Sequence, residues 1–181
     1  MKSPQLVVVW TLPLLLGLAC GYTPVNTALP FGQPAILLEP ITETAPTGLA
    51  NELTRSLAQL LTTGSMRFTA DATEATAVLK GRVVTTSTRG ASITATDRAA
   101  EAFVFNAKIH IELVATESTE VLWRTTFPAN EAFRQVTGNQ ASAVETETGR
   151  RLAIGRLADA LALEIREQLL IASMAAEAKE I

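Results

Sequence analysis

Two side chains with the chemistry for catalysis or metal binding, Cys20 and His110, occur only once each in this chain of 181 residues. A nucleophilic thiol needs a nearby base, and a zinc site needs three or four nitrogen, sulfur or oxygen ligands. One cysteine and one histidine supply few of these groups, so we predict a protein that is not an enzyme and has neither a metal nor a cofactor. His110 alternates with Lys108 and Glu112 along a predicted strand, which favours a solvated or interface histidine.

Cys20 follows a pattern that is typical of an export signal. Residues 6–18 form an uncharged and mostly apolar stretch. A bilayer-spanning helix needs about 20 apolar residues, whereas the apolar region of a secretory signal has about 7–15. The small residues Gly17 and Ala19 suit a signal peptidase. We therefore predict a signal peptide over residues 1–19 that is cleaved.

The position of Cys20 directly after a small residue resembles the lipobox of bacterial lipoproteins, whose cysteine receives a diacylglyceryl group and, after cleavage, a further acyl chain. An ordinary signal peptide is the alternative, because the lipobox favours leucine where this chain has Gly17. A lone exported cysteine would otherwise be an unpaired thiol in an oxidising compartment, which is unusual. We predict lipidation at Cys20 and a membrane anchor, and Gly21 in place of aspartate indicates the outer membrane.

The residues after Cys20 have the length and composition of a single domain. The chain is 48% hydrophobic and 18% charged, and its net charge of −3 gives no support for nucleic acid as a partner. Prolines and few strong formers of structure predict an extended leader over residues 20–34. We predict one α+β domain over residues 35–172 and a flexible tail over residues 173–181.

Hydrophobic periodicity predicts the elements of this domain. Leucines at helical spacing indicate an amphipathic helix, and strict alternation of apolar and polar residues indicates a half-buried strand. The predicted elements are a strand at 35–41, a helix at 49–61, strands at 77–86, 103–114 and 120–127, and a helix at 141–172. Residues 66–68 are a candidate for a further short strand. Because each helix and the sheet have an apolar side, we expect a two-layer sandwich with two helices on a mainly antiparallel four-stranded sheet.

Several short motifs, in this order and spacing, resemble the LptE family of lipopolysaccharide-assembly lipoproteins. They are Cys20-Gly21-Tyr22, the apolar strand at 35–38, Gly48-Leu49-Ala50-Asn51-Glu52-Leu53-Thr54, Ala77-Val78-Leu79-Lys80-Gly81, and Val121-Leu122-Trp123. The resemblance implies a non-catalytic lipoprotein on the periplasmic side of the outer membrane. It also implies an LptD-like partner, which is a large β-barrel that translocates lipopolysaccharide. The lipoprotein would plug this barrel and help it to assemble. The resemblance further implies that the lipoprotein binds lipopolysaccharide. An accessory lipoprotein of a murein-synthesis or secretion complex is the alternative.

Basic residues of the predicted sheet are candidate contacts for lipopolysaccharide, because its phosphates favour lysine and arginine. If neighbouring strands pair, Arg82, Lys108 and Arg124 share the wet face, and Arg89 lies at a turn. We predict lipopolysaccharide binding by these four residues. Scattered surface charge is the alternative for any one of them.

Aromatic residues near the end of the sheet are candidate contacts for a protein partner, because aromatics dominate buried interfaces. We predict an interface role for Phe133. For Trp123 and Phe127 we prefer core packing, because both lie on the same strand face as Val121. Gly81 inside a strand indicates a close approach by backbone or by a helix.

Overall fold

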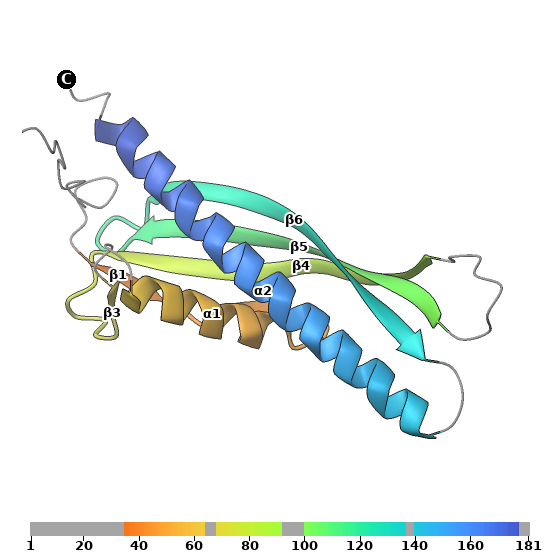
Figure 1. The fold of residues 1–181 in the computed structure, drawn as a ribbon. Coiled ribbons are helices and arrows are strands. Elements are labelled where there is room, and N and C mark those ends of the chain that lie inside the picture. The colour runs from red at the N-terminus through yellow and green to blue at the C-terminus, as the bar shows by residue number, and fades with distance from the viewer. Residues whose placement is uncertain (1–34, 64–67, 92–99, 137–139, 178–181) are drawn as a thin grey trace, which may run out of the picture.

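The computed structural model describes residues 35–63, 68–91, 100–136 and 140–177. These residues form two layers, with both helices on one side of a sheet (Figure 1). The elements in chain order are β1 (Ile36–Leu38), β2 (Thr42–Glu43), α1 (Leu49–Thr63), β3 (Phe68–Thr69), β4 (Ala77–Ala91), β5 (Ala100–Ala115), β6 (Val121–Val136) and α2 (Gln140–Glu177). The predicted signal peptide, Cys20 and the leader lie outside the described residues. No helix in the four ranges is long and apolar enough to cross a membrane.

The sheet has six strands in a mixed arrangement, so the prediction of four mainly antiparallel strands is wrong in detail. The strand order is β3-β1-β4-β5-β6, with β2 also paired to β4. β1 runs parallel to β3 and β4, and β2 runs parallel to β4, whereas β4, β5 and β6 are antiparallel neighbours. The helix α1 between β1 and β4 makes a crossover, and a crossover returns the chain in the parallel direction. The predicted first strand at 35–41 is shorter in the structure, where β1 ends at Leu38, and the separate strand β2 begins at Thr42.

β6 continues through Pro128 to Val136, although we expected the strand to stop before the proline. The amide of Glu39 donates to the carbonyl of Leu79, 3.0 Å away, so the odd-numbered peptide groups of β4 point towards β1. Peptide groups alternate in direction along a strand, so the even-numbered ones of β4 point to β5. Following the register through β5 to β6 shows that the peptide group of Pro128 points to the free edge of the sheet. A proline there costs no ladder hydrogen bond.

The other predicted elements are present, with bounds that are longer than predicted. β4 ends at Ala91, and β5 already begins at Ala100. α2 continues to Glu177, into the expected tail. The predicted two-layer α+β architecture with two helices is confirmed.

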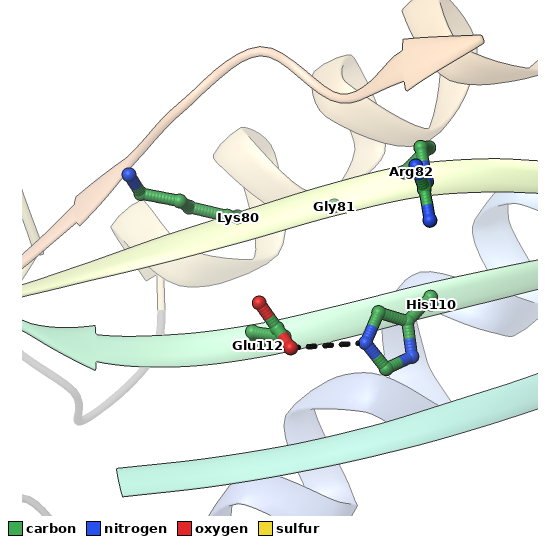
Figure 2. A pocket seen from close by; sticks show the side chains of 5 residues that line it. All are labelled: Lys80, Gly81, Arg82, His110 and Glu112. Carbon is green, nitrogen blue, oxygen red and sulfur yellow. Dashed lines mark hydrogen bonds and ion pairs between the residues drawn. The ribbon is translucent and has the colours of Figure 1, made fainter. Parts of the chain in front are cut away.

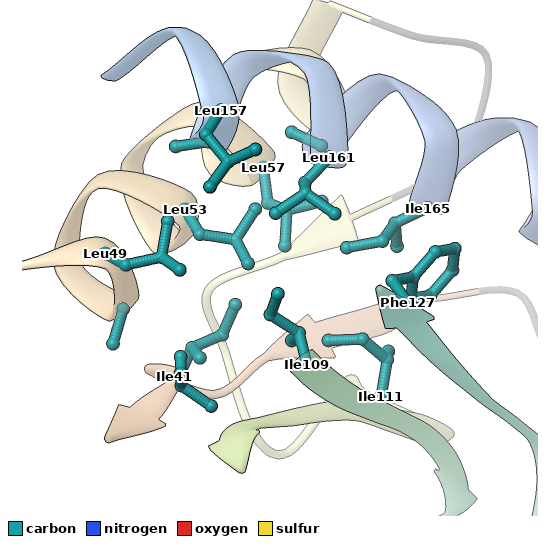
Figure 3. Packing of buried hydrophobic residues seen from close by; sticks show 14 of the residues in the cluster. Ile41, Leu49, Leu53, Leu57, Ile109, Ile111, Phe127, Leu157, Leu161 and Ile165 are labelled. Carbon is teal, nitrogen blue, oxygen red and sulfur yellow. The ribbon is translucent and has the colours of Figure 1, made fainter. Parts of the chain in front are cut away.

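The core lies between the helices and one face of the sheet (Figure 3). The predicted leucine stripes of both helices are buried, and they pack on alternate residues of β4, β5 and β6. Burial of one leucine or isoleucine side chain contributes about 1.5–3 kcal/mol. The fully buried large side chains are Ile36, Leu49, Leu53, Leu57, Leu61, Leu79, Ile109, Ile111, Leu113, Leu161, Ile165 and Leu169.

The two helices run in the same direction and are joined by polar contacts. The buried Ser56 hydroxyl donates to Asp159 Oδ1 at 2.6 Å. Arg150 Nη1 lies 3.5 Å from the carbonyl of Thr47, at the start of α1. In both pairs the two residues are 103 positions apart in sequence, so the two helices advance in the same direction.

The start of α1 is capped by a carboxylate from β2. Gly48 has a φ of +88°, a conformation that glycine adopts at little cost. Its amide donates to Glu43 Oε1 at 3.0 Å, and the Thr47 hydroxyl donates to Glu43 Oε2 at 2.8 Å. A carboxylate at this end also interacts favourably with the helix dipole. The contact holds α1 to the sheet.

Gly81 is a point of close approach, as predicted, but side chains and not a helix or backbone approach it. A Cβ at this position would lie 2.8 Å from Ile111 Cδ1 and 2.8 Å from Ile41 Cγ1. Both isoleucines belong to the core, so only glycine fits without a shift of buried side chains.

Candidate functional site

The face of the sheet that points away from the helices is the candidate functional site, which we call the open face. Among the described elements, none packs on it (Figure 1). Its side chains come from β4, β5 and β6, because residues that alternate with the buried ones point to this side. Most of them are exposed and polar.

A β-bulge decides which residues of β4 reach the open face. The register with β5 shifts between Val83 and Thr85, so that Arg82 pairs with His110 and Arg89 pairs with Val104. Without the shift, two residues seven positions apart would point to opposite faces. The bulge therefore places Arg82 and Arg89 on the same side.

The half of the open face nearest β1 has basic and acidic side chains together. In register across β4, β5 and β6, Lys80 lies opposite Glu112 and Arg124 on the far strand. Arg82 and His110 occupy the next row. We call these five residues the acid-containing half. Four of them and Gly81 line a shallow pocket of about 300 Å³ (Figure 2).

The charges of the acid-containing half are partly compensated. His110 Nε2 lies 3.1 Å from Glu112 Oε1, and Arg124 Nε lies 4.0 Å from the same oxygen. Lys80 Nζ lies 3.5 Å from Glu39 Oε1. The other ring nitrogen of His110 is 3.0 Å from the Thr126 hydroxyl. His110 is thus held in a structural network.

The other half of the open face, at the far ends of β4–β6, has basic side chains without acidic neighbours. It contains Arg89, Lys108 and Arg134, which we call the acid-free half. All three are exposed, and none forms an ion pair within the described part of the chain. Uncharged residues lie between the cations. Val104 is in register with Arg89, and the next row towards Lys108 contains Ser87, Asn106 and Asn130.

The carboxylate nearest to the acid-free half in sequence points to the helices. Glu131 lies between exposed positions of β6, and its Oε1 accepts from Arg156 Nε of α2 at 2.8 Å. It therefore leaves the charge of the open face unchanged. An anionic ligand at the acid-free half meets three cations and no described carboxylate.

The pKa shifts that are resolved belong to groups away from the open face. The pKa of the Glu147 carboxyl is lowered to about 2 by hydrogen bonds from Arg150 and Arg151, with their charges as a further cause. The guanidinium nitrogens are 2.9 and 3.0 Å from this carboxylate. No group of three or more metal-ligating side chains occurs among the residues that the structure describes.

The structure places all four predicted basic residues on one face. Arg82, Lys108 and Arg124 are on the wet face, as the expected strand pairing requires. Arg89 joins them within β4, rather than in a turn. Arg134 was missed because residues 129–136 were expected to lie outside the sheet. The sequence did contain a signal for it, because Arg134 follows Arg124 by ten residues and an even spacing along one strand places both side chains on the same face.

The predicted partner contact Phe133 lies at the edge of the core. Its side chain is 8% exposed, and its ring stacks on Phe103 with the centroids 5.8 Å apart. This packing leaves little of the ring for a partner. Phe127 is buried as predicted, and Trp123 is half-buried with its ring 6.4 Å from Phe127.

The fold and the open face define a small two-layer α+β protein with a free sheet surface. A family profile described as lipopolysaccharide-assembly, LptE, matches residues 34–169. This match covers most of the chain, so the chain belongs to the LptE family. Comparison with curated proteins gave no match.

Solved structures that are similar to this chain come from several bacteria. A hypothetical protein from Chlamydia trachomatis is 11% identical, covers 78% of this chain and 98% of its own, and has a TM-score of 0.52. A DUF330-family protein from Xanthomonas campestris is 13% identical over 84% of this chain and 92% of its own, with a TM-score of 0.50. Rare lipoprotein B from Shewanella oneidensis is 13% identical, covers 79% and 97%, and has a TM-score of 0.42. At these identities the likeness concerns the fold alone.

Proposed function

We propose that this protein is an outer-membrane lipoprotein that binds lipopolysaccharide and works with a large β-barrel partner during lipopolysaccharide assembly. Membership of the lipopolysaccharide-assembly family supports the general role. The observation that supports lipopolysaccharide as the ligand is the acid-free half of the open face. There Arg89, Lys108 and Arg134 are exposed without a described carboxylate. Phosphate groups form strong, charge-assisted hydrogen bonds with such side chains.

The two halves of the open face have different roles in this proposal. Arg82 and Arg124 extend the basic surface, but Glu112 lies between their strands and repels an incoming phosphate. The cations of the acid-free half have no such neighbour. We therefore assign the main phosphate contacts to the acid-free half, and secondary contacts to Arg82 and Arg124.

Charge reversal tests the ligand. Changing Arg82, Arg89 and Lys108 together to Glu should weaken binding of purified lipopolysaccharide in a pull-down. All three side chains are exposed, so the thermal unfolding midpoint should stay within a few degrees. Unchanged binding by a folded triple variant would show that the sheet is not the lipopolysaccharide site.

Co-purification tests the partner. Affinity capture of the tagged full chain from solubilised outer membranes should recover one large β-barrel protein in near-equal amount. Recovery of a murein-synthesis enzyme or a secretion complex in its place would contradict the proposed partner and support the other class of lipoprotein.

Cys20 is the proposed site of lipid attachment. Several acyl chains on this residue would hold the protein at a membrane much more firmly than one chain. Cys20→Ser should give a folded protein that membrane fractionation finds mostly in the periplasmic fraction. A Cys20→Ser protein that stays tightly bound to the membrane would show that contacts with a partner, and not the lipid, hold it there.

A further inference from the structure

One part of the β6 edge presents backbone hydrogen-bonding groups to the surroundings. β6 is the last strand of the sheet and pairs only with β5. The alternation that points Pro128 to the edge applies to the even-numbered residues of β6 from Arg124 onwards, because the register with β5 shifts between Val121 and Trp123. A second contact agrees with this direction, because Arg156 Nη2 of α2 lies 3.5 Å from the carbonyl of Ala132. From Arg124 onwards, the outward groups of β6 therefore belong to its even-numbered residues.

Pro128 divides this edge into a covered part and an open part. Beyond it, Arg156 contacts Ala132, and a Cβ at Gly149 of α2 would lie 3.5 Å from the carbonyl of Arg134. α2 thus packs against the edge of the backbone there. Pro128 itself has no amide hydrogen to offer.

Before Pro128, the outward peptide groups belong to Arg124 and Thr126, and we call this segment the open edge. Within the described residues, no hydrogen bond is made to the backbone of Arg124 or Thr126 from outside the sheet. Each outward residue offers one donor and one acceptor, spaced two residues apart, or roughly 6.6 Å. Another extended backbone is the chemical group that matches this spacing.

We propose that the open edge binds a short extended segment of another protein, about 4–6 residues long, as an added β-strand with a carboxylate beside Arg124. The Arg124 side chain is 63% exposed, and its nearest carboxylate, on Glu112, is 4.0 Å away. Opposite charges in neighbouring strands stabilise a pair, and like charges destabilise it. Pairing of two copies through the open edge would bring Arg124 close to its own counterpart. An acidic segment from a different protein avoids this repulsion.

Hydrogen exchange tests the open edge without any use of lipopolysaccharide. The probe is the synthetic peptide acetyl-Thr-Val-Glu-Val-Thr-Val-amide, added to the purified full chain and followed by NMR. Without peptide, the amides of Arg124 and Thr126 should exchange at least tenfold faster than those of Thr125 and Phe127. Saturating peptide should slow Arg124 and Thr126 at least tenfold, and a peptide with Lys in place of Glu should bind several-fold more weakly.

A matched pair of variants isolates the backbone contribution. Thr126→Pro removes an outward amide and should weaken peptide binding at least tenfold, while the fold is kept because β6 already contains Pro128 in the same orientation. Thr126→Ala loses the hydroxyl but keeps the amide, and should bind like the native chain. Equal binding by both variants, slow exchange of Arg124 and Thr126 before peptide is added, or protection that rises with protein concentration alone would each overturn the proposal.

Discussion

The two halves of the open face are built from the same three strands, yet they differ in charge. In the acid-containing half, Glu112 lies between Lys80 and Arg124 in the register and contacts His110. In the acid-free half, the three cations have only uncharged residues between them, and no described carboxylate is present. The difference comes from the identity of the side chains and from the bulge after Val83, which places Arg89 on this face.

The comparison shows why a count of surface charges is a poor guide to an anion site. The full chain has a net charge of −3, and that value gives no sign of a basic surface. Cations that are already paired with carboxylates gain little from a new anion, because the new contact replaces an existing one. Separation of the unpaired cations from the paired ones is the property that defines the proposed site.

The largest expected effect on stability comes from the backbone beneath the acid-containing half. Gly81→Val should lower the free energy of unfolding by about 2 kcal/mol, because its side chain would collide with Ile41 and Ile111 in the core. Urea unfolding measures the change. Arg89 and Lys108 are remote from the collision, so the folded variant should keep its lipopolysaccharide affinity. A large loss of affinity in that variant would place the main contacts in the acid-containing half.

A smaller effect on binding should follow from removal of the carboxylate. Glu112→Gln makes the acid-containing half more like the acid-free half, and it removes the repulsion of a phosphate beside Arg124. We expect lipopolysaccharide affinity to rise roughly threefold at low salt, and the gain to shrink as salt screens the charges. Titration at two salt concentrations measures this. A fall in affinity would show that Glu112 organises the site.

The smallest expected effect concerns Glu147 on α2, a carboxylate held by arginines in the helical layer. Because its pKa is lowered in the folded protein, its ionised form adds stability above its usual pKa of 4.5, and this contribution is lost as the pH falls through about 2. Glu147→Gln should therefore unfold at a lower temperature than the native chain at pH 6, and the gap should close towards pH 2. A gap independent of pH would contradict the ion pairs. Lipopolysaccharide binding should be unchanged.

The sequence predicts the parts of this fold that depend on strong periodicity. The strand containing Phe105, Ile109 and Ile111 alternates cleanly, and both leucine stripes have helical spacing, so their buried faces follow from the residue pattern. From that pattern and strand pairing, the shared position of Arg82, Lys108 and Arg124 was also predictable.

The features that the sequence did not reveal depend on tertiary pairing. β2 contains two residues and is a strand only because it pairs with β4, whereas β3 overlaps the candidate strand at 66–68 at Phe68. Pro128 indicated a strand end, but whether a strand can contain a proline depends on which way the peptide group of the proline points. The bulge after Val83 has no local sequence signal that we recognise, and it sets the face of Arg89. The acid-free half was therefore not visible as a unit.

A matched pair of triple variants tests the central claim most directly. One variant changes Arg89, Lys108 and Arg134 to Glu, and the other changes Lys80, Arg82 and Arg124 to Glu. The two variants alter net charge equally, so a difference in binding reports on position. Each lost contact is worth about 1 kcal/mol, so the first variant should lose on the order of 100-fold in lipopolysaccharide affinity. We expect the second to lose roughly tenfold or less, and equal losses, or a larger loss in the second variant, would contradict the account.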